Sequence, residues 1–97
     1  MKLNEAIEKI NNLIAEESRF KIGKTWLTKE EVFKTNYIGK YDRIEKICSS
    51  DCKMPVDIFE GQLIEFYREH AKCDNDKASS EVLQESGKYM VYIVIRS

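Results

Sequence analysis

The chain has 97 residues, of which 42% are apolar and 34% are charged, and its net charge is −1 at neutral pH. These values predict one soluble globular domain over residues 1–97, and the low net charge argues against a strong, general affinity for nucleic acid. No apolar run approaches the roughly 20 residues that span a bilayer, and the first residues lead into an amphipathic pattern rather than a signal sequence. We therefore expect a cytoplasmic location and no membrane partner.

The charge is unevenly distributed along the chain. Residues 1–18 carry a net charge of −2, residues 19–46 carry +4, and residues 47–97 carry −3. The middle segment is therefore a basic island in an acidic protein.

The first predicted element is an amphipathic helix over residues 4–17. Apolar residues recur there at intervals of three and four, and Asn4 is a suitable N-cap. We expect its apolar stripe to cover a sheet rather than bind a partner.

A strand is predicted next, over residues 19–26. In an extended chain Phe20, Ile22 and Lys24 would point to one side, and Lys21, Gly23 and Thr25 to the other. A glycine inside a strand marks a bulge or the close approach of another group, and two lysines border this one. The stretch is thus either an ordinary strand with solvated lysines or the rim of a phosphate site. It is not a P-loop, because Ser18 stands where that motif needs a glycine.

A capping box predicts a short helix over residues 29–35, since Thr28 and Glu31 have the required spacing. Residues 36–39 then read as a turn, because asparagine and glycine tolerate the backbone angles of turns. This turn and the residues after it carry Tyr37, Lys40, Tyr41 and Arg43. The two phenols either pack against the sheet or stack on a ligand.

The second half of the chain predicts a strand over residues 43–49 and a long helix with Pro55 in its first turn, ending near His70. Glu60 should sit at the edge of that helix's apolar face. Residues 73–88 are a polar loop, with a helical turn near 80–84. Residues 89–96 are a strand that is apolar on both faces and so belongs in the middle of a sheet. The fold class is α+β, a small antiparallel sheet of about three strands flanked by three or more helices.

Three cysteines, an odd number in a chain with no export signal, argue against a disulfide framework. With His70, they give the spacing of a conceivable zinc set: Cys48, Cys52, His70 and Cys73. We favour the other interpretation, in which Cys48 is a buried apolar side chain and His70 interacts with the dipole at a helix end.

The run Lys21-Ile22-Gly23-Lys24-Thr25, followed by a capped helix, a strand, a helix with Glu60-x2-Leu63-Ile64, and Asn75 beyond it, resembles the GIY-YIG nuclease superfamily. The resemblance covers residues 20–75 and is closest to variants whose second signature strand reads Lys-Ile-Gly. It implies a small antiparallel sheet flanked by helices, and DNA cleavage that depends on a divalent metal such as Mg²⁺.

By this resemblance Glu60 would bind the metal and take part in catalysis, and Gly23 and Thr25 would shape the floor of the site. No Gly-Ile-Tyr strand precedes residue 20, so Tyr92 would have to supply that strand's tyrosine from the other end of the chain. This requires the strand at 89–96 to pair with the strand at 19–26. On spacing alone, Tyr92 is a core aromatic and Glu60 a solvated flank.

Two further departures bear on catalysis. Lys21 replaces the tyrosine of the second signature strand, and the arginine of the next helix has no counterpart. Phosphodiester hydrolysis needs charge stabilisation and a positioned group that activates water, so these losses favour a catalytically impaired domain.

We therefore expect a nucleic-acid-binding domain in which lysines hold phosphates and tyrosines stack on bases. The expected binding residues are Lys21, Gly23, Lys24, Thr25, Tyr37, Lys40, Tyr41 and Arg43. One alternative is an acidic module that docks on another protein. A second alternative is an active, metal-dependent DNA endonuclease. The nuclease-like proposals assume that the glycine-bearing strand and Glu60 face one shared hollow.

Overall fold

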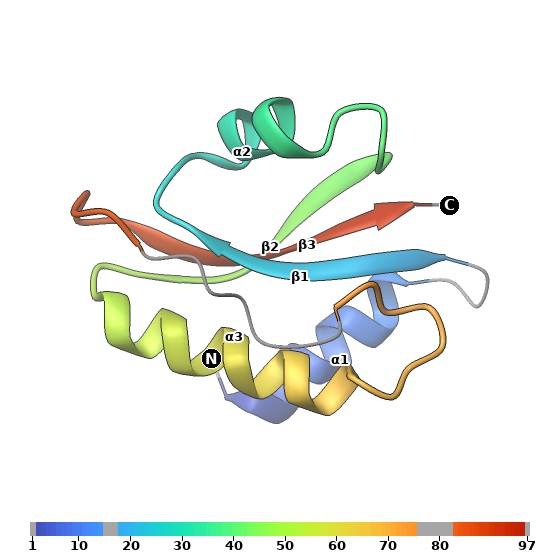
Figure 1. The fold of residues 1–97 in the computed structure, drawn as a ribbon. Coiled ribbons are helices and arrows are strands. Elements are labelled where there is room, and N and C mark those ends of the chain that lie inside the picture. Colours follow the sequence, from blue (N-terminus) through green and yellow to red (C-terminus); the bar gives the residue numbers. More distant parts are fainter. Residues whose placement is uncertain (1, 15–17, 76–82, 97) are drawn as a thin grey trace.

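The computed structural model describes residues 2–14, 18–75 and 83–96. Its elements are α1 (Leu3–Leu13), β1 (Arg19–Thr25), α2 (Lys29–Asn36), β2 (Arg43–Ser50), α3 (Lys53–Tyr67) and β3 (Tyr89–Arg96). The strands form one antiparallel sheet in the order β1-β3-β2. Helices α1 and α3 cover one face of this sheet and α2 lies on the other (Figure 1). The predicted α+β class is confirmed.

β3 is the central strand, as its apolar sequence predicts. Every residue from Tyr89 to Ile95 is buried, and β3 pairs with β1 along one edge and with β2 along the other. The pairing with β1 aligns Gly23 with Tyr92. A strand buried on both faces needs apolar side chains on both, which explains its unbroken run of β-branched and aromatic residues.

The free edge of β1 is covered by the segment that follows α3. The backbone N–H of Phe20 donates to the carbonyl of Lys72 (3.0 Å), and the N–H of Asp74 donates to the carbonyl of Phe20 (2.7 Å). Asn75 continues this pairing with its side chain, since its Oδ1 accepts from the N–H of Ile22 (2.7 Å) and its Nδ2 donates to the Ile22 carbonyl (3.0 Å). The segment thus occupies backbone groups that an edge strand would otherwise expose.

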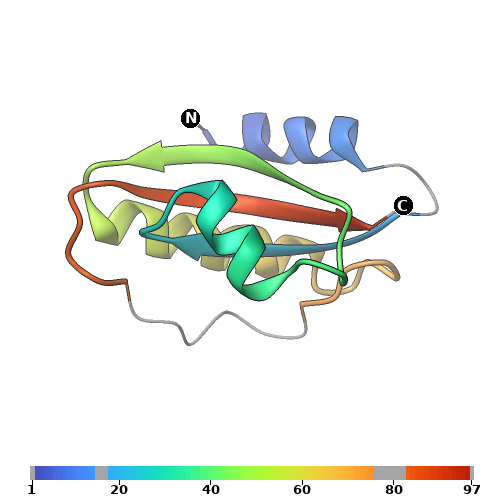
Figure 2. The ribbon, with the colours of Figure 1, turned by 90° about the horizontal axis from the view of Figure 1, so that it is seen from above.

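The two faces of the sheet bury separate clusters. On the α1/α3 face, Phe20 and Ile22 of β1 pack among apolar residues of both helices. On the α2 face, Tyr92 and Val94 of β3 pack against Val32 of α2. Figure 2 shows α2 lying across the strands on its side of the sheet, with α1 beside β2. The predicted alternation of β1 and the sheet-covering role of the first helix are confirmed.

Several predicted boundaries were wrong. The N-cap of α1 is Lys2, and Asn4 lies inside the helix, because the carboxylate of Glu5 accepts the backbone N–H of Lys2 (3.1 Å) and closes the helix two residues earlier. α3 ends at Tyr67, so His70 belongs to the turn that follows. The predicted last turn of the first helix, over residues 15–17, and the predicted helical turn near 80–84 fall largely outside the described residues. Within the described ranges, no helix has the length and apolar character to cross a bilayer.

Candidate functional site

A hollow of about 390 Å³ opens on the α2 side of the sheet, and we call it the lysine hollow. It is lined by Lys21 of β1, by Asn36 at the end of α2, and by Tyr37, Lys40 and Tyr41 of the turn that follows. The structure therefore brings together four of the residues that the sequence proposes for nucleic-acid binding. No carboxylate lines the hollow among the residues described, so its charge is that of two ammonium groups.

Two tyrosines of the lining, Tyr37 and Tyr41, form a cluster of aromatic rings with the buried Tyr92. Tyr37 is buried, its hydroxyl lies 2.6 Å from that of Tyr92, and its ring makes edge contacts with the rings of Tyr41 and Tyr92. The Tyr41 hydroxyl donates to Asp74 (2.5 Å), whose other oxygen accepts from the Arg19 guanidinium (2.6 Å). Burial, followed by the hydrogen bond to Asp74, raises the pKa of Tyr41 well above its usual value. The phenol is therefore a fixed, neutral donor.

Gly23 is required by the same tyrosine cluster. A Cβ at position 23 would lie 2.4 Å from the hydroxyl oxygen of Tyr92 and 2.5 Å from its Cζ. The close approach that the sequence predicts at this glycine is thus made by the side chain of Tyr92, its partner on the neighbouring strand. Tyr92 is a buried core aromatic whose hydroxyl is hydrogen-bonded to that of Tyr37.

Lys24 points the opposite way, into the α1/α3 face. It is 4% exposed, forms an ion pair with Asp57 of α3, and its Nζ lies 3.5 Å from Oε1 of Glu60. Although burial lowers the pKa of Lys24, the hydrogen bond with Asp57 and the charges of Glu60 and Asp57 outweigh it and raise the pKa overall. Lys24 follows Phe20 and Ile22 on the apolar side of the strand, and a buried lysine needs an acidic partner. This position in the alternation is therefore the sequence signal for a buried ion pair.

The expectation of a shared hollow is therefore wrong. Glu60 is 1% exposed and contacts Lys24 on the α1/α3 face, whereas Tyr92, Gly23 and Lys21 belong to the α2 face. Glu60 lies at the centre of the buried side of α3 rather than at its edge, because the Lys24 ammonium meets its charge there. The Glu60 carboxylate is thus balanced by an ammonium group, and a Mg²⁺ ion at Glu60 stays a prediction.

Two other proposed binding residues make structural contacts. Thr25 is buried, and its hydroxyl accepts the backbone N–H of Leu27 (3.1 Å) in the turn after β1. Arg43 donates to the carbonyl of Leu13 (2.8 Å) at the end of α1. Thus Lys24, Thr25 and Arg43 do not join the lysine hollow, because each is directed to another part of the fold.

The cysteines and His70 do not gather into one cluster among the residues that the structure describes. Among the described residues, no three His, Cys, Asp or Glu side chains are grouped closely enough to hold a metal ion. Burial raises the pKa of both the Cys48 and the Cys73 thiols. The His70 ring instead packs at 5.1 Å from that of Phe20, and its Nδ1 accepts the backbone N–H of Lys72 (3.1 Å).

No protein-family model, curated protein or solved structure gives a significant match to this chain. β3 does pair with β1, which the replacement of the missing nuclease strand by residues 89–96 requires. The relationship to GIY-YIG nucleases stays a prediction.

Proposed function

We propose that this domain binds the phosphate backbone of a nucleic acid through the lysine hollow and does not cleave it. The observation that carries the proposal is the convergence of Lys21 and Lys40, from two different elements, on a concavity lined by neutral side chains. Two ammonium groups without a carboxylate between them favour an anion, and phosphate contacts of this kind position a nucleic acid without reading its sequence.

The packing of the tyrosines limits how the lysine hollow could hold bases. Tyr37 is buried between two other rings and has little surface on which a base could stack. Tyr41 is half-buried, and it is the ring of this cluster that retains some exposed surface. We therefore expect weak binding dominated by phosphate contacts, with one base stacked at most.

The position of Glu60 argues against cleavage. Hydrolysis of a phosphodiester needs a metal or cation and a water-activating group next to the bound phosphate. Glu60 and Lys21 lie on opposite faces of the sheet, and the Glu60 carboxylate contacts the Lys24 ammonium. A strand bound in the lysine hollow would not meet the one carboxylate that the nuclease resemblance assigns to catalysis.

Fluorescence anisotropy with a short labelled single strand, measured at two salt concentrations, tests this proposal. Binding should weaken as salt rises, because each phosphate contact releases counterions. The double variant K21A/K40A should bind more weakly, and the slope of log affinity against log salt should fall by roughly 1.4, at about 0.7 per lost contact with a single strand. The charge-matched control K29A/K34A removes two lysines that do not line the hollow.

Two results would refute the proposal. One is the absence of binding even at low salt. The other is an equal loss of affinity in both double variants, since that would assign the attraction to net charge rather than to the hollow.

A second candidate function rests on the outer face of α3. Met54, Ile58 and Phe66 are large apolar side chains with exposed fractions of 71%, 55% and 57%. Exposed acids, Asp57 and Glu65, lie beside them on the same helix. An apolar stripe with acidic neighbours fits a basic amphipathic helix of another protein, which supplies apolar contacts and complementary charge.

A labelled helical peptide with leucine on one face and lysine on the other would probe this stripe. Ile58→Asp should weaken its binding at least about tenfold, because one charge interrupts the apolar contact and about 1.4 kcal/mol corresponds to that factor. Ile38→Asp is the matched control, since Ile38 is also an exposed isoleucine (68%) but belongs to the turn beside the lysine hollow. Equal effects of the two variants would count against a docking site on α3.

A further inference from the structure

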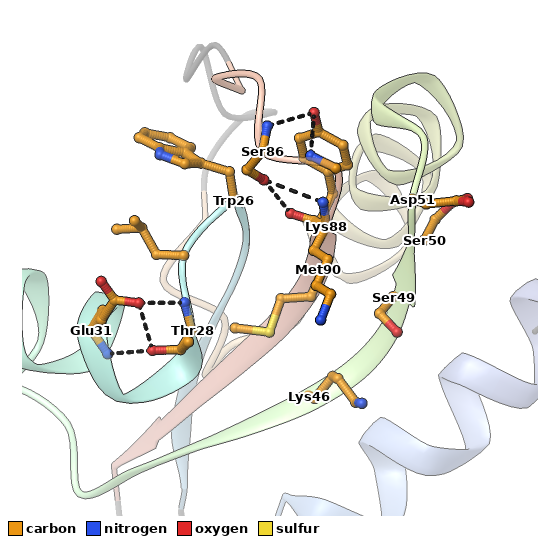
Figure 3. A pocket seen from close by; sticks show the side chains of 13 residues that line it. Trp26, Thr28, Glu31, Lys46, Ser49, Ser50, Asp51, Ser86, Lys88 and Met90 are labelled. Atoms are coloured by element: carbon orange, nitrogen blue, oxygen red, sulfur yellow. Dashed lines mark hydrogen bonds between the residues drawn. The ribbon is translucent and has the colours of Figure 1, made fainter.

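A second hollow, of about 670 Å³, opens where β2 ends, and we call it the β2 hollow. It is bounded by the turn from β1 into α2, by the last residues of β2 and by the turn that leads into β3 (Figure 3). Lys46, Ser49 and Lys88 contribute two ammonium groups and an exposed hydroxyl to it. Its lining shares no residue with that of the lysine hollow.

A β-bulge in β2 turns Lys46 and Ser49 to the same face of the sheet. Side chains alternate along a regular strand, so two residues three positions apart would face opposite sides. The register of β2 against β3 shifts after Lys46, which pairs with Tyr92. Ser49 then pairs with Met90, and both partners belong to the cluster on the α2 face. Because paired residues of neighbouring strands share a face, the bulge directs Lys46 and Ser49 to the side on which the lysine hollow opens.

The α2-facing side of β2 carries no carboxylate. The strand has one acid, Glu45, which pairs with Ile93 of the cluster on the α1/α3 face. The residues of β2 that pair with the cluster on the α2 face are Ile44, Lys46 and Ser49. An anion that follows this side of β2 therefore meets a cation and a hydroxyl and no like charge of the strand.

The two lysines of the β2 hollow are available to an anion. Across the described residues, neither the Lys46 nor the Lys88 ammonium has a hydrogen bond or an ion pair. Of the two acids in the lining, Glu31 is engaged in the capping box, where its carboxylate accepts from both the N–H (3.2 Å) and the hydroxyl (2.9 Å) of the N-cap residue. The other, Asp51, is directed away from Met90 in Figure 3.

The rim that carries Lys88 is fixed by its own hydrogen bonds. The Ser86 hydroxyl donates to the Lys88 carbonyl (2.7 Å) and accepts the Lys88 N–H (3.3 Å). The hydroxyl of buried Tyr89 accepts the N–H groups of Ser86 (3.1 Å) and Gly87 (3.4 Å). Gly87 has a φ of +77°, which glycine adopts without strain. The turn is therefore held in place before any ligand arrives, which lowers the entropy lost on binding.

The pairing of the strands gives the separation of the two hollows. Lys21 pairs with Val94 of β3, whereas Ser49 pairs with Met90 of the same strand. The two rows are therefore four residues of β3 apart, about 14 Å at about 3.4 Å per residue. A strand stacked as in B-form DNA carries one phosphate about every 3.4 Å of its axis, so about four nucleotides cover that distance.

We infer that the nucleic acid bound by the lysine hollow is a single strand that continues along β2, where its phosphates contact Lys46, Lys88 and the Ser49 hydroxyl. This inference rests on the proposed function and extends its site. A duplex is a stiff rod with a persistence length of about 150 base pairs, so it does not bend into two hollows about 14 Å apart. A single strand does, and it joins two weak sets of contacts into one stronger interaction.

Fluorescence anisotropy with a labelled thymidine dodecamer and a labelled thymidine trinucleotide tests this inference. In K46A/K88A the slope of log affinity against log salt should fall by roughly 1.4 for the dodecamer, at about 0.7 per lost contact. The slope for the trinucleotide should stay at the wild-type value, because a trinucleotide fills one hollow at a time. K21A/K40A should lower the dodecamer slope by the same amount, and K29A/K34A, whose lysines line neither hollow, should leave it unchanged.

The outcomes separate this inference from the proposed function. If K46A/K88A binds the dodecamer with the wild-type slope while K21A/K40A does not, the inference is overturned and the proposed function stands. The inference is also overturned if a duplex of the same length binds as tightly as the single strand. If the wild-type protein binds neither oligonucleotide at low salt, the proposed function fails and the inference fails with it. Circular dichroism of K46A/K88A establishes that a lost contact is not a loss of folding.

Discussion

The buried contact between Lys24 and Glu60 predicts a strong and asymmetric effect on stability. Lys24→Met keeps the length of the side chain but removes the ammonium that faces a carboxylate only 1% exposed. Removing one partner of a buried ion pair typically costs about 3–5 kcal/mol. A domain of 97 residues has a free energy of unfolding of about 5–15 kcal/mol, so this variant should lose a large part of it.

Glu60→Gln should cost less. The amide fills nearly the same volume without a charge, and Lys24 keeps Asp57, an exposed acid with which it is paired in the native fold. The lost charged contact is worth about 1.5–3 kcal/mol. In the double variant K24M/E60Q neither charge remains buried, so it should be more stable than K24M alone, with a coupling free energy on the order of 2 kcal/mol.

Urea unfolding followed by Trp26 fluorescence measures all four proteins of this cycle. Lys21→Met is the matched control, because Lys21 lies on the same strand but on the other face, and it should change stability by no more than about 0.5 kcal/mol. The reasoning fails if K24M costs no more than E60Q, or if the two effects add within about 0.5 kcal/mol.

Three further predictions concern the rest of β1 and α3. Gly23→Ala places a methyl group 2.4 Å from the Tyr92 hydroxyl, so urea unfolding should show a loss of about 1–3 kcal/mol that Tyr92→Leu partly restores; an unchanged midpoint would contradict this. Asn75→Ala leaves the N–H and carbonyl of Ile22 without their partner, which should cost on the order of 2 kcal/mol and speed amide exchange at Ile22; unaltered exchange would refute it. Burial, and then the charge of Cys73, raise the pKa of Tyr67 to about 12, so stability should fall as pH rises from 10 through 12, by at most about 1.4 kcal/mol per pH unit for this group. Tyr67→Phe should reduce that slope in urea titrations at several pH values.

Local pattern was enough to predict the elements. The capping box at Thr28 fixed the start of α2, the unbroken apolar run identified β3 as the central strand, and alternation separated the two faces of β1. Each of these features depends on residues within one element and its caps, where spacing and chemistry act directly. The start of the first helix was predicted two residues too late, because the Glu5 carboxylate rather than Asn4 provides the capping hydrogen bond.

Contacts between distant residues were harder to predict. Glu60 lies 36 positions beyond Lys24, and periodicity alone placed it at the edge of an apolar face. The sequence did show Lys24 on the apolar side of β1, but it did not show that Glu60 is its partner. Asn75 was recognised only as part of a family resemblance, and its pairing with Ile22 depends on a turn after α3 that no local pattern specifies. Such pairings are decided by how whole elements pack, and a single sequence carries that information only indirectly.

The length of α2 explains why the lysine hollow opens on its side of the sheet. Eight helical residues extend about 12 Å, at 1.5 Å per residue, whereas the eight residues of β3 extend about 26 Å. On the opposite face, the 11 residues of α1 and the 15 of α3 together cover the strands and bury the larger cluster. A helix less than half as long as the strand it covers leaves part of that face uncovered, and the lysine hollow opens where α2 ends. Lys21 and Lys40 line this space and favour an anion, so the proposed binding follows from incomplete coverage of the sheet by α2.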